Sequence, residues 1–325
     1  MTKIAGYYEL ESSFVTNAAI ADLTLETLIE GHAVTIELPR LSATNPWELA
    51  PARSVPWTNG DWGMVTSLEG GRAASIVVQS IGFTFEVASD DPTERAREIV
   101  LQLDAWWAKT SSWLEIATGQ ILSKIGHTTV ETIGEKTPVW SVNDDEDGHK
   151  PLTWPSVTTI DMGNRVRAVD KDNLAAALAL VAIDKSPPLA WTLVRDARSL
   201  ADAGQLRRAI VDLGSAAEIG VRTLLHHQLD LTVPTGIKER LTKRPPTLGQ
   251  AAQILEQAGF GSLPASFRSD VVEIRNRVVH LAAASSTDDV SYEEYECALK
   301  SAVAVVELAS PLPDGIVREW YERED

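Results

Sequence analysis

The segment from Arg275 to His280 carries the side chains of this sequence that are best suited to chemistry. It reads RNRVVH, so a guanidinium, an amide and an imidazole fall within six residues. On a helix of 3.6 residues per turn, Asn276 and His280 lie on one face, about one turn apart. Because an imidazole can take up and release a proton near neutral pH, His280 is a candidate acid or base with an amide neighbour.

Arg275 has an unusual position on the same helix. Val271, Ile274 and Val278 form an apolar stripe that continues to Leu281, and Arg275 projects into this arc. A guanidinium is too costly to bury alone. Arg275 must therefore be paired, reach solvent along its stem, or face another subunit.

An earlier helical segment offers a carboxylate for this guanidinium. The pattern between 206 and 228 predicts a buried stripe, and Glu218 falls at the edge of that stripe. If the two helices pack together, Glu218 is the most economical partner for Arg275. The alternative is that both side chains reach solvent from the edges of their helices.

The second half of the sequence predicts the helices that would position these residues. From Asp172 onward, segments rich in Ala, Leu and Arg have helical spacing, and capping boxes occur at 247–250 (TLGQ) and 291–294 (SYEE). The predicted helices span 172–184, 188–203, 206–228, 248–258, 265–284 and 292–309.

The first half of the sequence has the texture of strands. Alternating runs at 32–38 (HAVTIEL) and 82–89 (GFTFEVAS) are typical of half-buried strands. Short runs of this kind dominate residues 1–88, and further strand patterns occur at 128–142 and 157–169.

One long helix is predicted between these strand patterns, from Asp91 to about Thr118. Asp91 precedes Pro92, and Glu94 follows three residues later, which is a helix-start signature. The expected fold class is α+β. A β-rich α+β domain at 1–170 would be followed by an all-α helical bundle at 171–325.

The motif and its helical setting resemble the HEPN superfamily. An Arg, a polar residue and a His in a late helix match that family's R-x4-6-H motif, here Arg275-Asn276-x3-His280. The segment 204–225 (GQLRRAIVDLGSAAEIGVRTLL) is similar to the helix pair that usually precedes this motif. The resemblance covers about residues 172–308 and leaves the first half of the chain unexplained.

This resemblance implies a metal-independent endoribonuclease whose cleft lies between two HEPN-like domains. His280 would move the proton of an RNA 2′-hydroxyl or leaving oxygen, Arg275 would stabilise charge on the phosphorane, and Asn276 would orient the imidazole or phosphate. No cofactor and no metal are expected. The expected partners are an RNA substrate and a second copy in a homodimer, with a role in bacterial antiviral defence or toxin-like growth control.

The HEPN superfamily also has catalytically silent members, so a second interpretation stays open: a module that dimerises or binds a ligand or protein. The formal charge of −17 favours this alternative, because negative charge opposes binding to RNA phosphates. Six basic residues argue the other way. These weak RNA-binding candidates are Arg207, Arg208, Arg240, Lys243, Arg244 and Arg277.

Composition and motifs exclude several other classes. Cys297 is the only cysteine, which excludes an intrachain disulfide and a cysteine-based zinc site and fits a reducing compartment. The acidic turn at 143–148 departs from a calcium-loop pattern, and the usual nucleotide, dinucleotide and zinc-protease motifs do not occur. No stretch reaches the ~18 apolar residues of a membrane span. A cytoplasmic location without membrane contact is expected.

Tryptophan is unusually frequent in the first half of the chain. Seven of the ten tryptophans precede residue 141. They could line a recognition surface or fill a core, and Trp106 and Trp113, which share a helix face, favour the core. The first domain is expected to sense or target, with a protein or a small molecule as its trigger.

Overall fold

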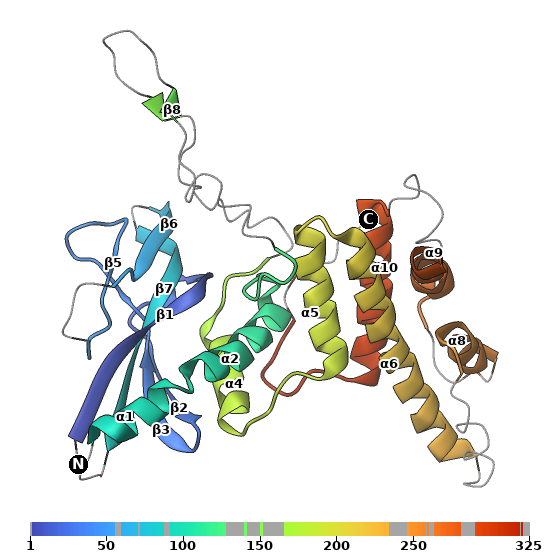
Figure 1. Ribbon diagram of the computed structural model, residues 1–325, viewed down its shortest axis with the longest axis horizontal. Coiled ribbons are helices and arrows are strands. Elements are labelled where there is room, and N and C mark those ends of the chain that lie inside the picture. Colours follow the sequence, from blue (N-terminus) through green and yellow to red (C-terminus); the bar gives the residue numbers. More distant parts are fainter. Residues whose placement is uncertain are drawn as a thin grey trace.

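The protein is α+β, with an antiparallel sheet followed by helices, as the sequence predicts. Figure 1 shows the sheet at one end of the molecule and most of the later helices at the other. The computed structural model describes residues 2–55, 60–70, 72–87, 92–127, 140–141, 150–151, 166–233, 246–257, 259, 263–280, 290–318 and 320.

Five strands form the main sheet, in the order β1, β7, β3, β2, with β6 also paired to β7. Strand β7 is the centre of the sheet, because β1 pairs with it on one side and β3 and β6 pair with its two halves on the other. Strands β1 and β7 each have 16 residues, longer than the short runs that the sequence predicts. The five strands are β1 (Thr2–Asn17), β2 (Thr24–Ile29), β3 (His32–Glu37), β6 (Gly63–Glu69) and β7 (Arg72–Val87).

The predicted alternation is confirmed in β3, whereas in β7 Thr84 is buried like Phe83 and Phe85, and only Glu86 is exposed between buried neighbours. Val34 and Ile36 are buried and stand opposite Phe85 and Phe83 in the antiparallel register, and Val87 is buried too. Because successive residues of a strand point to opposite faces, Val34, Ile36, Phe83 and Phe85 share one face of the sheet. They give the sheet its apolar inner face.

Two short strand pairs accompany the main sheet. The strand patterns predicted at 128–142 and 157–169 lie largely outside the described residues, apart from β8 and a parallel bridge between Thr16 and Val169. The acidic turn at 143–148 also lies outside them. The short pairs are β4 (Arg40–Leu41) with β5 (Leu49–Ala50), and β8 (Trp140–Ser141) with β9 (Lys150–Pro151).

The prediction of one helix from Asp91 to about Thr118 is wrong. The chain forms α1 (Pro92–Val100) and α2 (Leu103–Thr118), separated by a turn in which Leu101 is 69% exposed. The two helices pack against different neighbours, α1 against β7 and α2 against helices of the second half. Because neither Gly nor Pro occurs at this break, no local signal marks it.

All six helices predicted in the second half are present. The helix predicted at 265–284 begins with a π-helical segment, η3, and its residues after His280 lie outside the described part. Both capping boxes form, with Ser291 accepting from Glu294 N–H and Thr247 from Gln250 N–H. The elements are α4 (Lys171–Ala182), α5 (Leu189–Asp202), α6 (Leu206–Thr232), α8 (Leu248–Gln257), η3 (Arg268–Glu273), α9 (Ile274–His280) and α10 (Tyr292–Ala309).

The hydrophobic core has two parts, and α4 belongs to the part beneath the sheet. Leu174, Ala177 and Leu178 of α4 are buried with the sheet residues, and Thr27 of β2 donates to the Leu178 carbonyl. The second core, of the helical bundle, is formed by residues of α5, α6, α8, η3, α9 and α10, together with Ile116 of α2. The domain boundary predicted between 170 and 171 stays a prediction. Helix α4, which follows that boundary, packs in the core of the sheet.

Helix α2 joins the two cores. Its Trp113 and Leu114 are buried in the core of the sheet, whereas Ile116 is buried in the core of the bundle. Near the end of the described chain, Trp320 donates from its indole nitrogen to the Ile116 carbonyl at 2.6 Å, and the Arg198 guanidinium lies 4.1 Å from the Trp320 ring centroid. These contacts fix the sheet half against the bundle.

A carboxylate is buried at this junction. Glu115 is 1% exposed, and its Oε1 accepts hydrogen bonds from Leu122 N–H, Ser123 N–H and the Ser123 hydroxyl. Its Oε2 lies 3.6 Å from Arg195 Nε and has no hydrogen-bond partner in the described part of the chain. Burial raises the pKa of Glu115, opposed by the Ser123 N–H and the Arg195 charge.

The tryptophans of the first half are mostly core residues. Trp62, Trp106, Trp107 and Trp113 are buried, whereas Trp47 is 51% exposed. The interpretation as core is therefore confirmed for these four. Trp57 lies outside the described residues, and only the backbone of Trp140, in β8, is described.

Candidate active site

Arg275 stands at the contact between α9 and α6. The aliphatic part of its side chain covers Gly214 so closely that a Cβ at that position would lie 2.6 Å from Arg275 Cγ. The side chain of Arg275 keeps 30% of its surface exposed, and its Nη1 donates to Asn276 Oδ1 at 3.3 Å. The stem of Arg275 thus packs against α6, and part of the side chain is open to solvent.

Glu218 is near Arg275, as the packing argument expects, but it has a closer partner. Glu218 Oε2 lies 4.0 Å from Arg275 Nη2, whereas Glu218 Oε1 lies 2.6 Å from Arg222 Nη2. Arg222 follows Glu218 by four residues, a spacing that favours ion pairs on a helix and could have predicted this contact. Neither Arg275 nor Glu218 is deeply buried, with side chains 30% and 25% exposed.

Asn276 and His280 both face solvent. They belong to α9, His280 is its last residue, and neither side chain is used by the core. The spacing of four puts them on one face of the helix, whereas Arg275, five residues before His280, lies about 140° around the helix from it and contacts Asn276. Each of the three polar side chains of the motif thus reaches solvent at least in part, on a helix whose apolar face is fixed by Ile274 and Val278.

Arg277 has a different role from the other basic candidates. Its Nη2 lies 2.5 Å from Glu294 Oε1, which joins α9 to the first turn of α10. The Arg277 guanidinium, together with Ser291 N–H, holds the pKa of Glu294 below its usual range. Glu294 also belongs to the capping box of α10. Arg277 thus links two helices.

Of the remaining basic candidates, the structure describes only Arg207 and Arg208, and it shows neither of them hydrogen-bonded or ion-paired to Arg275. Arg207 and Arg208 lie at the start of α6, Arg207 being seven residues before Gly214 and so roughly 10 Å away along the helix axis. Arg208 is exposed and donates to Gln205. Arg240, Lys243 and Arg244 lie outside the described residues.

The charges around Arg275 nearly balance. Three guanidiniums, of Arg222, Arg275 and Arg277, stand against two carboxylates, of Glu218 and Glu294. Each of these guanidiniums therefore has a carboxylate within 4.0 Å.

The close contact between Gly214 and Arg275 predicts a sign change in stability. Gly214→Ala should destabilise the protein by about 1–3 kcal/mol, because the new methyl group displaces the Arg275 stem. In an Arg275→Ala background the same change should stabilise by about 0.5–1 kcal/mol, since Ala is the better helix former. Urea melts of the four proteins measure both values. Equal effects in the two backgrounds would contradict the contact.

No metal cluster and no spanning helix are found where the structure describes the chain. Within that part, no three His, Cys, Asp or Glu side chains gather as metal ligands, and no helix has the length and apolar character to cross a membrane. No family model matches the chain, and neither a curated protein nor a solved structure shows significant similarity to it.

Proposed function

We propose that the helical half is a HEPN-like domain and that the protein is a metal-independent endoribonuclease. The observation that carries this proposal is the joint exposure of Arg275, Asn276 and His280 on a helix seated firmly against α6. An exposed imidazole with an amide on the same helix face, and a guanidinium 30% exposed on the same helix, are groups that can transfer a proton and stabilise charge on a phosphate.

The reaction follows from what these three groups can do. The imidazole of His280 takes the proton of a ribose 2′-hydroxyl, and the 2′-oxygen attacks the adjacent phosphorus. The bond from phosphorus to the 5′-oxygen breaks, and that oxygen receives a proton. Arg275 stabilises the negative charge that develops on the phosphorane, and Asn276 orients the imidazole or the phosphate. The products are a 2′,3′-cyclic phosphate and a free 5′-hydroxyl.

A single His280 cannot easily serve as base and acid at once, which supports a site shared by two copies of the chain. A homodimer would place two imidazoles at one phosphate, one to remove a proton and one to supply it. We place the activity in bacterial antiviral defence or toxin-like growth control, with RNA as substrate and the sheet half as the sensing part.

The purified protein is therefore expected to cleave RNA in the presence of EDTA. The fragments should end in 2′,3′-cyclic phosphates, because the 2′-oxygen is the nucleophile and no metal-bound water takes part. Gel analysis of a labelled RNA, with treatment of the ends by phosphatase and by acid, measures both features. Cleavage that requires a divalent ion, or that leaves 3′-hydroxyl ends, would contradict this mechanism.

One observation favours the alternative of a catalytically silent binding module. Arg275 already has a carboxylate, Glu218, at 4.0 Å, and each neighbouring guanidinium also has one. A motif with a purely structural role in ion pairing would have these same contacts. In that case the protein would dimerise or bind a ligand without cleaving RNA.

A further inference from the structure

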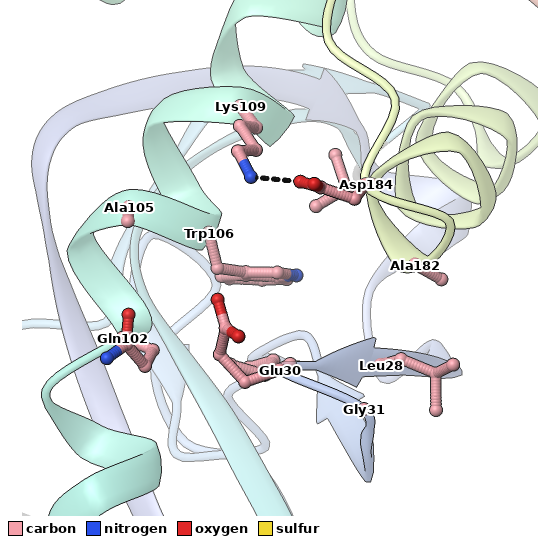
Figure 2. Close-up of a pocket in the computed structure, with 11 residues that line it drawn as sticks. Leu28, Glu30, Gly31, Gln102, Ala105, Trp106, Lys109, Ala182 and Asp184 are labelled. Carbon is pink, nitrogen blue, oxygen red and sulfur yellow. Dashed lines mark hydrogen bonds and ion pairs between the residues drawn. The ribbon is translucent and has the colours of Figure 1, made fainter.

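A cavity lies on the sheet half, remote in sequence from the Arg275 motif. It is open to solvent and lined by the turn between β2 and β3, the first turns of α2 and the end of α4, and its volume is about 200 Å³. Figure 2 shows the side chains that line it. A water molecule occupies ~30 Å³ in the liquid, so the cavity has room for a small metabolite rather than a drug-sized ligand.

The indole of Trp106 supplies an unused hydrogen-bond donor to this cavity. Trp106 is 4% exposed, and its Nε1 has no hydrogen-bond partner among the residues that the structure describes. Figure 2 shows the nitrogen-bearing edge of the ring directed into the space between the turn and the end of α4. A buried donor without an acceptor is destabilising, so a ligand that brings an acceptor to Trp106 gains that interaction.

Three other buried indoles show what Trp106 lacks, whereas Trp62 Nε1 is, like that of Trp106, without a hydrogen-bond partner among the described residues. Trp113, Trp191 and Trp320 each donate from Nε1 to a backbone carbonyl, at 3.0, 2.7 and 2.6 Å. These three donors are satisfied within the fold. The donor of Trp106 instead faces the cavity.

Charged groups surround the same cavity. Lys109 follows Trp106 by three residues on α2, so both face the cavity from one helix. Lys109 donates to Asp184, as Figure 2 shows, whereas Glu30 has no ion pair within the described part of the chain. Two carboxylates and one ammonium give the lining a net negative charge, and the C-terminal end of α4 adds to it. This lining favours a ligand with a positive group.

The position of Glu30 is set by the backbone. Glu30 and Gly31 have φ of 49° and 78°, which is a tight turn with two left-handed residues. Such turns prefer Asn, Asp or Gly, and Glu is an unfavourable choice for a turn alone. Figure 2 shows its carboxylate reaching toward the Trp106 ring. We therefore infer that the Glu30 side chain has a role in the cavity in addition to its place in the turn.

We propose that this cavity binds a small zwitterion of amino-acid size. Its ammonium group lies against the Glu30 carboxylate, and its carboxylate accepts from Trp106 Nε1 and faces the Lys109 ammonium. Donors on α2 and an acceptor on the turn form opposite walls, so a molecule with both charges matches them best. This proposal is independent of RNA cleavage, and its test contains no RNA.

The test uses the full chain labelled with ¹⁵N at the indole nitrogens. The indole resonance of Trp106 is assigned as the one missing in a Trp106→Phe variant. Titration with ω-amino acids from glycine to 5-aminopentanoate should shift it saturably for at least one of them, at millimolar concentrations. The resonances of Trp113 and Trp191 should stay in place. Absence of a selective shift with the whole series would overturn the proposal.

Matched ligands separate the two charges. 4-Aminobutanoate has an ammonium group at one end of a four-carbon chain and a carboxylate at the other. Putrescine has an ammonium group at both ends of such a chain, and succinate has a carboxylate at both ends. Both should bind at least ~10-fold more weakly than the zwitterion, which corresponds to about 1.4 kcal/mol. Equal binding of either one would mean that one charge suffices and would overturn a zwitterion site.

Two variants test the role of Glu30. Glu30→Asn suits the turn, so the hairpin should fold, yet the ammonium partner is lost and affinity should fall ~10-fold or more. Glu26→Gln removes an exposed carboxylate from the same hairpin outside the cavity and should leave affinity unchanged. Unchanged binding in Glu30→Asn, or an equal loss in both variants, would overturn the assignment.

Discussion

Replacing His280 with alanine is expected to lower the rate of RNA cleavage by ~10² or more. The imidazole is the only group of the motif that can take up and release a proton at neutral pH, so its loss removes proton transfer rather than binding. Because His280 is exposed at the end of α9, the substitution should leave the thermal midpoint almost unchanged. Single-turnover cleavage and a thermal melt of the same preparation measure both quantities.

A matched control is available on a neighbouring helix. His226 of α6 is also exposed, so His226→Ala removes an equivalent imidazole outside the motif and should retain full activity. Equal losses in the two variants would point to a general effect of surface charge. Full activity in His280→Ala would instead remove the nuclease proposal and favour the silent binding module.

Much of the fold follows from local sequence patterns. The alternation in HAVTIEL and GFTFEVAS predicts strands because one face must be buried, and the capping residues Thr247 and Ser291 mark helix starts because they satisfy free backbone N–H groups. These signals act over a few residues. The strands and helix starts that they predict are therefore found in the structure wherever no distant contact favours another conformation.

Features that depend on distant contacts were not predictable in this way. The break between α1 and α2 carries no Gly or Pro, and it reflects the different neighbours of the two helices. The burial of α4 with the sheet rather than with the bundle depends on the partner surface that its apolar residues meet. A helical pattern specifies an apolar face but not the element that covers it.

The candidate site was predicted in part, for the same reason. Wheel angles place Arg275 and Glu218 at the edges of their apolar stripes, and the structure brings them to 4.0 Å. The contact between Gly214 and the Arg275 stem could not be predicted from wheel angles, since it depends on how closely α9 approaches α6. The same reasoning also missed the cluster around Glu115, which assembles from α2, α5 and the residues after α2.

Removing the Glu115 carboxylate is expected to have the largest effect on stability. Glu115→Ala leaves Leu122 N–H and Ser123 N–H without their acceptor, at a cost of about 3–5 kcal/mol, whereas Arg195 keeps its ion pair with Asp196. Urea melts at neutral pH measure this loss. Glu26→Ala, which removes an exposed carboxylate from β2, should change stability by less than about 0.5 kcal/mol.

Glu115→Gln separates the hydrogen bonds of this residue from its charge. The amide oxygen can still accept from Leu122 and Ser123, so the loss seen with alanine should be largely avoided. Burial raises the pKa of Glu115 above its value in the unfolded chain, about 4.3. The contribution of the carboxyl group is therefore complete below pH ~4.3 and is lost as the pH rises through the folded-state pKa. The stability of the wild type relative to Glu115→Gln should fall over that range, and a difference that is flat or rises with pH would show that Arg195 outweighs burial at this junction.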